Sequence, residues 1–216
     1  MEVGWYMKLV DLKVAEFLDE LARGSPSPGG GSASALGGAL AAALVAMVAD
    51  VTVGKGKYKN VEDELKEVLR DATCLISRMT SLVDEDSQAF DALLAALRLP
   101  RGSAEAKEKR DTEIQQATKK AAEVPLELAR RSVEVMKLAE VVVRKGNVNA
   151  ISDGGVAALL GEAAFRGGVY NVKINLSSLT DETYKKAVVQ ELGALEEQMA
   201  ILTNRVTQVV DQRIRT

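Results

Sequence analysis

The chain has 216 residues, of which 47% are hydrophobic, 27% are charged and only 4% are aromatic, and its formal net charge is −3. This composition favours one all-α domain over residues 1–216, with a core built mainly from Ala, Val, Leu and Ile, and the acidic balance argues against a nucleic-acid partner. The sequence contains no His and one Cys, which excludes His-based catalysis, zinc sites that combine Cys with His, and an intramolecular disulfide. Any chemistry must therefore use Asp, Glu, Lys, Arg, Tyr, Ser or Asn, and a cytoplasmic location is expected.

The first half of the sequence predicts three helices. Apolar residues recur at helical spacing from Lys8 to Arg23, ahead of a Gly- and Pro-rich stretch. A second helix, from Ser32 to about Val53, consists mostly of Ala and Gly, and Gly37 and Gly38 leave room for close helix packing. Its apolar run is short for a bilayer crossing and follows a charged segment, so we interpret it as the central helix of a bundle with no membrane partner. An apolar stripe from Asn60 to Leu97 predicts the third helix.

The second half continues the helical pattern with one exception. A fourth helix is predicted from Ser103 to about Lys145, in which Pro125 should kink the helix or restart it. A short helix from Ser152 to Arg166 should end at two glycines. Residues Val169–Leu176 then alternate loosely and predict an extended segment. Thr180 and Asp181 should cap a last helix from Glu182 to about Arg213.

The Gly-rich stretch before the central helix is the first candidate site. Its backbone N–H groups, at the start of a helix, are suited to receiving an anion. The alternative is a turn in which Ser32 caps the helix. A nucleotide-binding loop of the Walker type is excluded, because no Lys stands where that motif requires one. The candidate residues are Gly29, Gly30, Gly31 and Ser32.

A basic segment follows the central helix and forms the second candidate site. Lys55 and Lys57, with Tyr58, either complement the negative end of the helix or bind a carboxylated ligand, and one lysine would then be a proton donor.

Two further polar clusters each have a structural and a functional interpretation. The acidic run at residues 84–86 is either a solvated helix face or the source of a general base, and at most one or two of its carboxylates can face a cleft. The run at residues 147–153 either caps the helix after it or holds a small polar ligand, and alternating residues of the extended segment would serve the same pocket. The residues concerned are Asp84, Glu85 and Asp86, then Asn147, Asn149, Ser152 and Asp153, then Asn171, Lys173 and Asn175.

Six short motifs together resemble the cyclodeaminase/cyclohydrolase family of folate enzymes, and they cover nearly the whole chain. Each motif alone is weak, but their order along the chain is specific. The motifs are P-x-P-G-G-G-S-x-x-A at Pro26–Ala35, V-G-K-x-K-Y at Val53–Tyr58, D-x-x-A-F at Asp86–Phe90, A-A-E-V-P-L at Ala121–Leu126, N-x-N-A-x-S-D at Asn147–Asp153 and Y-N-V-x-I-N-L at Tyr170–Leu176.

The resemblance implies a helical, dimeric, stand-alone enzyme that acts on the one-carbon unit bridging N5 and N10 of tetrahydrofolate. It implies either a cyclodeaminase, which forms 5,10-methenyltetrahydrofolate and ammonia from the 5-formimino compound, or a methenyltetrahydrofolate cyclohydrolase. Neither reaction requires a metal or a cofactor beyond the folate substrate, so a chain without His can perform it.

On this hypothesis Asp153 or Asp86 is the general acid/base, and Lys57 or Lys55 is a proton donor or binds a glutamate carboxylate. Asn149 and Ser32 orient the substrate. The remaining substrate-binding candidates are Gly29, Gly30, Gly31, Tyr58, Ser152, Asn171 and Asn175. The competing hypotheses are a non-catalytic helical assembly protein and a folate carrier.

Overall fold

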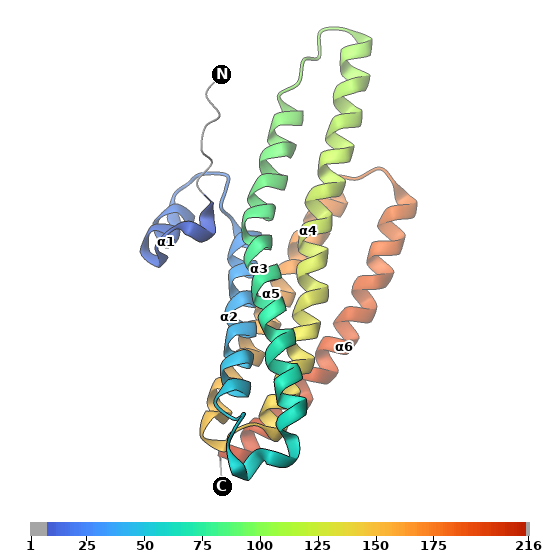
Figure 1. Ribbon diagram of the computed structural model, residues 1–216. Helices are drawn as coiled ribbons and strands as arrows, with labels where there is room; N and C mark the ends of the chain where they lie inside the picture. The colour runs from blue at the N-terminus through green and yellow to red at the C-terminus, as the bar shows by residue number, and fades with distance from the viewer. Residues whose placement is uncertain (1–7, 215–216) are drawn as a thin grey trace.

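The structure, a computed structural model, describes residues 8–214, and within these it consists of six α-helices and three 3-10 turns (Figure 1). No strand occurs in residues 8–214, as the all-α prediction requires. The α-helices are α1 (Val14–Ala22), α2 (Gly30–Asp50), α3 (Glu62–Leu97), α4 (Ala104–Lys145), α5 (Ile151–Ser177) and α6 (Glu182–Ile214). The 3-10 turns are η1 (Leu9–Asp11), η2 (Gly56–Val61) and η3 (Val148–Ala150).

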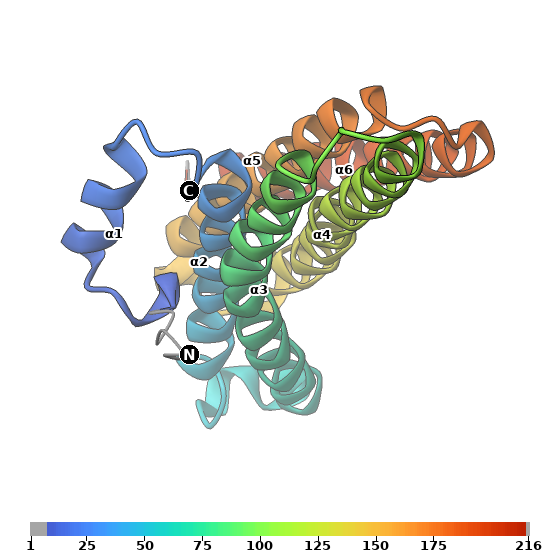
Figure 2. The ribbon, with the colours of Figure 1, turned by 90° about the horizontal axis from the view of Figure 1, so that it is seen from above.

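The five longer helices form a bundle, and α1 lies beside it. The long helices α3 and α4 run antiparallel as a hairpin, α2 and α5 pack against them, and α6 packs against α4 and α5 (Figure 1). Seen from above, α1 lies on the side of α2 that faces away from α3 and α4 (Figure 2). The bundle therefore covers α2 on one side only.

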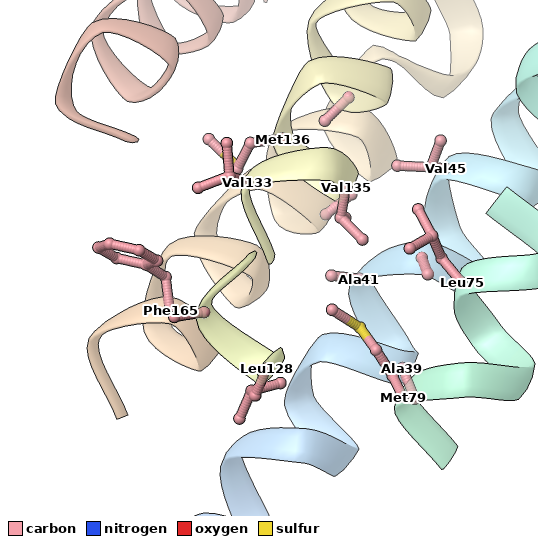
Figure 3. Packing of buried hydrophobic residues seen from close by; sticks show 14 of the residues in the cluster. Ala39, Ala41, Val45, Leu75, Met79, Leu128, Val133, Val135, Met136 and Phe165 are labelled. Atoms are coloured by element: carbon pink, nitrogen blue, oxygen red, sulfur yellow. The ribbon is translucent and has the colours of Figure 1, made fainter. Parts of the chain in front are cut away.

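The Ala- and Gly-rich composition of α2 permits close packing in the core. A Cβ on Gly38 would lie 2.7 Å from Sδ of Met79 and 3.4 Å from Cβ of Ala164, so a larger residue at this position between α3 and α5 would force the Met79 side chain to move. Figure 3 shows Leu75 and Met79 of α3 turned toward the small side chains of α2, among them Ala39 and Ala41. This side of α2 is fully buried, and the prediction of a central Ala/Gly-rich helix is confirmed.

Helix α2 is also long and apolar enough to cross a membrane by length and composition, but 56% of the relevant window is buried inside the bundle. A core helix of a soluble protein satisfies the same criterion.

Helix α4 continues through Pro125 without a restart. Proline has no backbone N–H, so the carbonyl of Ala121, one turn earlier, lacks its helical donor. The side-chain amide of Asn175 supplies that donor, with Nδ2 2.9 Å from the Ala121 oxygen, and Ala121 itself is buried. The motif at Ala121–Leu126 and the motif at Tyr170–Leu176 are therefore joined by this hydrogen bond.

The extended segment predicted at Val169–Leu176 is wrong, because α5 runs without interruption from Ile151 to Ser177. The two glycines expected to end the helix serve packing instead. A Cβ on Gly167 would lie 2.0 Å from Oγ of Ser34, and one on Gly168 would lie 2.9 Å from the carbonyl oxygen of Pro125. Close contacts with α2 and α4 compensate for the low helix propensity of glycine here.

The helix ends also differ from the sequence predictions. The first helix is shorter, because the backbone is extended at Leu12 and Lys13 and α1 begins at Val14, where Glu16 accepts a hydrogen bond from the Lys13 N–H. Asp181 caps α6 as expected, with Oδ1 2.9 Å from the Tyr184 N–H. Thr180 instead donates its hydroxyl to Gln115.

Candidate functional site

The N-terminus of α2 holds a carboxylate from α3. The N-cap residue is Gly29, which has no side chain to offer, so the predicted cap role of Ser32 is wrong: Ser32 lies in the first turn and is fully buried. Its Oγ donates a hydrogen bond to Oδ2 of Asp86 at 3.0 Å. Asp86 also accepts from the Ser32 backbone N–H, so it does for this helix what an N-cap side chain normally does.

The carboxylate of Asp86 lies against the backbone of Gly31. A Cβ on Gly31 would be 2.0 Å from Oδ1 of Asp86, so any other residue here would force the carboxylate to move. Burial raises the pKa of the Asp86 carboxyl above its ordinary value, and this effect exceeds the opposing effect of the two hydrogen bonds from Ser32. Asp86 remains partly exposed, so it combines a raised pKa with access to solvent.

Each member of the acidic run on α3 points to a different partner. Oδ1 of the buried Asp84 accepts a hydrogen bond from the Leu9 N–H at 2.6 Å. Glu85 pairs with the guanidinium of Arg78, on the groove between α3 and α4. Of these three carboxylates, Asp86 alone contacts the α2 N-terminus.

The same part of α3 also holds the Pro-rich segment ahead of α2. The hydroxyls of Ser27 and Ser87 lie 2.5 Å apart and share a hydrogen bond. The peptide bond between Ser27 and Pro28 is cis. The Gly-rich stretch is therefore held at both ends, by Ser87 and by Asp86, and is not a free linker.

Helix α5 brings Asn171 to this site. Nδ2 of Asn171 would lie 3.8 Å from a Cβ placed on Gly30, and it donates to the carbonyl of Gly167 at 2.8 Å. Asn171 and Asn175 do share one side, as predicted, but on a helix rather than on an extended segment. Lys173 faces elsewhere and pairs with Glu196. Asn175 uses its amide N–H groups on the Ala121 and Asn171 carbonyls.

The other predicted residues gather at the opposite end of α2. Thr52, fully buried, accepts a hydrogen bond from the Asn147 N–H at 2.9 Å and donates to the Val48 carbonyl. The Tyr58 hydroxyl accepts from the Val148 N–H at 3.2 Å. These contacts join the segment after α2 to the start of α5, so Tyr58 and Asn147 have structural partners here.

Ser152 and Asp153 lie in the first turn of α5 but do not cap it. The N-cap residue is Ala150, and it has no side-chain cap hydrogen bond, so the predicted capping role of both residues is wrong. Asn147 instead caps the short turn η3, where its Oδ1 accepts from the Asn149 N–H. Lys55 and Lys57 are exposed, and no ion pair joins them to another residue within 8–214.

The two groups of predicted residues are far apart within one chain. Asn171 lies beside Gly30, and Asp153 is 18 positions earlier on the same straight helix, which at 1.5 Å per residue is roughly 27 Å away. Asp86 and Asp153 therefore cannot act on the same carbon atom from one chain. The Asp86 end combines a perturbed carboxyl, a hydroxyl, an amide and a glycine backbone, and it is our candidate site.

Two structural partners were not predicted from the sequence. Thr52 could not have been identified from the sequence, because threonines that donate to a carbonyl of their own helix are common. The pairing of Asn175 with Ala121 could have been suspected, because a proline inside a predicted helix leaves one carbonyl without a donor. In residues 8–214 no group of three or more Cys, Asp or Glu side chains is arranged to hold a metal ion.

Comparisons with known proteins identify relatives across most of the chain. A methenyltetrahydrofolate cyclohydrolase of Methylorubrum extorquens is 41% identical, over 93% of this chain and 97% of its own length. A formimidoyltransferase-cyclodeaminase of Rattus norvegicus is 32% identical over 89% of this chain, which spans only 36% of that protein. The crystal structure of a formiminotetrahydrofolate cyclodeaminase from Thermotoga maritima superposes with a TM-score of 0.86 at 32% identity, covering 94% of this chain and 98% of that one.

The family model described as formiminotransferase-cyclodeaminase matches residues 13–194. This match includes the Gly-rich stretch, Asp86, Asn171 and Asn175, and every helix except the C-terminal part of α6. The chain belongs to the formiminotransferase-cyclodeaminase family.

Proposed function

We propose that this protein is a tetrahydrofolate one-carbon enzyme that acts on the carbon bridging N5 and N10. It is either a cyclodeaminase, which converts 5-formiminotetrahydrofolate into 5,10-methenyltetrahydrofolate and ammonia, or a methenyltetrahydrofolate cyclohydrolase. The names of the relatives support both activities, and the relative named as a cyclohydrolase matches over nearly its entire length. Both reactions pass through a tetrahedral carbon between N5 and N10, which carries an amino group in the cyclodeaminase reaction and a hydroxyl in the cyclohydrolase reaction.

The partly exposed Asp86 carboxyl with its raised pKa carries the assignment of the site. In the hydrolase direction, water adds to the cationic bridging carbon, loses a proton, and the bond from carbon to N5 then breaks as N5 gains a proton. Asp86 would accept the first proton and deliver the second. A carboxyl with a raised pKa is better matched to both steps near neutral pH than an ordinary aspartate.

The neighbours of Asp86 would position the substrate. Ser32 fixes the carboxylate, and Gly31, which has no side chain, lets the carboxylate lie against the α2 backbone. The side-chain amide N–H of Asn171 donates to the Gly167 carbonyl. The side-chain oxygen of Asn171 is suited to accept a hydrogen bond from the pterin. Asn175, one turn further along α5, would help to position Asn171, because its side-chain amide donates to the Asn171 backbone carbonyl.

The cluster at the other end of α2 receives a separate role. Lys55 and Lys57 are exposed cations that would bind glutamate carboxylates of a folate tail. Asn149, Ser152 and Asp153 follow the segment that Thr52 and Tyr58 hold at the same end of the bundle. Because Asp153 lies roughly 27 Å from Asn171 along α5, we assign acid/base catalysis to Asp86 and not to Asp153.

We further propose that the enzyme is a cytoplasmic homodimer that needs no metal and no cofactor besides its folate substrate, and that it has no nucleic-acid or membrane partner. The chemistry supports the first part, since proton transfer by a carboxyl suffices for both reactions. The net charge of −3 supports the absence of a nucleic-acid partner.

The test is the absorbance of 5,10-methenyltetrahydrofolate in the presence of the purified protein. Accelerated loss of the methenyl compound identifies a cyclohydrolase, and its accelerated formation from the 5-formimino compound identifies a cyclodeaminase. Binding of the folate without either change in absorbance would show that the protein is a folate carrier. Absence of folate binding would favour a non-catalytic assembly protein.

A further inference from the structure

Ser87 follows Asp86 on α3, and the proposed mechanism gives it no part. The residue is buried, with 2% of its surface exposed. Its hydroxyl oxygen lies 2.5 Å from the hydroxyl oxygen of Ser27, although the two serines are 60 positions apart in the sequence. This hydrogen bond joins α3 to the Pro-rich segment ahead of α2, immediately beside the candidate site.

The backbone on both sides of Ser27 is stiff. Pro26 and Pro28 flank it, and the ring of a proline fixes φ near −65°. The residue before a proline is restricted as well, which limits the conformations of Ser25 and Ser27. Pro28 is itself buried. A hydrogen bond at the Ser27 side chain therefore fixes the position of the whole Pro-rich turn.

The next residues of the chain, 29–31, are three glycines with the opposite property. Glycine has wide backbone freedom and offers no side chain that could hold it in place. The glycine stretch is held instead by the residues at its two ends. Ser27 before it is bound to Ser87, and Ser32 after it is bound to Asp86.

The two ends of the glycine stretch meet adjacent residues of one helix. Asp86 and Ser87 project about 100° apart around α3, so each can reach a different end of the stretch. The Asp86 carboxylate also lies against the backbone of Gly31, in the middle of this arrangement. If the contact between Ser27 and Ser87 is lost, the glycine stretch gains freedom and the Gly31 backbone is no longer held from that side.

A third contact on the same turn of α3 does not constrain the glycine stretch. The buried Asp84 accepts a hydrogen bond from the Leu9 N–H at 2.6 Å. The whole of α1, Val14–Ala22, separates Leu9 from Ser27, and α1 lies beside the bundle (Figure 2). Asp84 therefore holds the segment before α1, whereas Ser87 holds the segment that leads into the site.

We propose that Ser87 and Ser27 are positioning residues for the reaction, and that their hydrogen bond holds the glycine stretch where Gly31 and Ser32 fix the Asp86 carboxylate in its productive geometry. Neither serine need touch the substrate, because both act through Asp86. Displacement of a catalytic group by about 1 Å is enough to lower turnover about a hundredfold. The catalytic part of this inference rests on the proposed function, whereas the ordering of the glycine stretch does not.

The catalytic part is tested by removing each hydroxyl. Ser87→Ala and Ser27→Ala should each lower kcat about tenfold or more and leave KM within about twofold, because Asp86 acts in the transition state. The double variant should lose no more than either single variant, since the two hydroxyls act as a pair. Ser27→Thr keeps a hydroxyl at a partly buried position and should retain turnover.

Ser132→Ala is the matched control for these variants. Ser132 is also a fully buried serine on a long helix, but its hydroxyl donates to the Leu128 carbonyl of its own helix at 2.8 Å. The substitution removes the same atom and has no contact with the glycine stretch to break. We expect it to keep the wild-type kcat.

The ordering of the glycine stretch is tested without substrate, by amide hydrogen exchange followed by NMR. The Ser32 N–H donates to Asp86 in the folded protein, so its exchange reports on this contact. Ser87→Ala and Ser27→Ala should accelerate exchange at Ser32 about tenfold or more, because the first turn of α2 then opens locally. Ser132→Ala should not, since a general loss of stability accelerates only the amides that exchange through global unfolding.

Two results would overturn the inference: exchange at Ser32 that Ser87→Ala leaves unchanged, or a loss of turnover as large in Ser132→Ala as in Ser87→Ala. Faster exchange at Ser32 with unchanged turnover would overturn the catalytic part and would also contradict the role of Asp86. If the wild type converts no folate, the proposed function fails and the catalytic part fails with it. The exchange measurement still decides whether the serine pair orders the glycine stretch, so the two failures are distinguishable.

Discussion

The Ser32 hydroxyl and the Asp86 carboxylate, 54 positions apart in the sequence, are joined by a hydrogen bond of 3.0 Å. This bond connects the Gly-rich stretch to the acidic run, two motifs that the sequence presents separately. It fixes the carboxylate at the positive end of α2, where burial nevertheless keeps the pKa of Asp86 raised. The predictions below follow from this pair and from the contacts that surround it.

A methyl group on Gly31 should disable the site. Gly31→Ala would place Cβ 2.0 Å from Oδ1 of Asp86 and force the carboxylate away from Ser32. We expect turnover of the folate substrate to fall about tenfold or more, as is common when a catalytic group is displaced by about 1 Å. Gly30→Ala is the control, since its nearest neighbour would be 3.8 Å away, and it should retain activity. Equal activity of the two variants would contradict the position we assign to Asp86.

The free energy of unfolding should depend on pH through the titration of Asp86. Because the folded state raises the pKa of this carboxyl above 3.8, folding favours its protonated form. The resulting stabilisation is complete below pH 3.8 and is lost as the pH rises through the raised pKa. Asp86→Asn does not titrate, so its free energy of unfolding minus that of the wild type should increase with pH across this window and then level off. Urea unfolding of both proteins at several pH values measures this difference, and a constant difference would show that the pKa is not raised.

Asn175 and Pro125 should be energetically coupled. Asn175→Ala leaves the buried Ala121 carbonyl without a donor, which typically costs about 1–3 kcal/mol. In the Pro125→Ala background the helix regains its own N–H for that carbonyl, so the same Asn175→Ala change should cost less. Urea unfolding of the four proteins gives the coupling energy. If Asn175→Ala costs the same in both backgrounds, the amide does not serve the proline.

The exposed Lys55 and Lys57 should contribute only to binding of the glutamate tail of the substrate. Lys55→Ala and Lys57→Ala should leave the turnover of a monoglutamate folate unchanged, because Asp86 lies at the other end of α2. The decrease in KM that accompanies added glutamates should be reduced in both variants. An unchanged dependence of KM on tail length would remove the tail-binding role.

The sequence predicted the bundle better than it predicted the site. Hydrophobic periodicity located α2, α3, α4 and α6 to within a few residues, since burial of one side of a helix leaves a strong pattern. It failed at Val169–Leu176, where glycines that usually end a helix instead admit Ser34 and the Pro125 carbonyl. Those neighbours come from distant parts of the chain, and no local pattern contains them.

The candidate site shows the same limit. The residue types were identified, but the sequence assigned Asn171 and Asn175 to the pocket of the 147–153 cluster, whereas α5 separates Asn171 from Asp153 by roughly 27 Å. Ser32 has the local pattern of a helix cap, yet Asp86 provides the cap from another helix. Only the tertiary arrangement distinguishes a residue that caps from one that holds a catalytic carboxylate.

The central claim, that Asp86 transfers protons at the bridging carbon, is tested most directly by the turnover of Asp86→Asn with 5,10-methenyltetrahydrofolate or the 5-formimino compound, whichever the wild type converts. The asparagine oxygen still accepts from Ser32, so the helix cap and the melting temperature should be retained, while Asp86→Ala should lose about 1 kcal/mol of stability. We predict that turnover by Asp86→Asn falls about a hundredfold or more and that Asp153→Asn, the matched control at the other end of α5, keeps most of its activity. Wild-type turnover in Asp86→Asn, or a hundredfold loss in Asp153→Asn alone, would contradict the account.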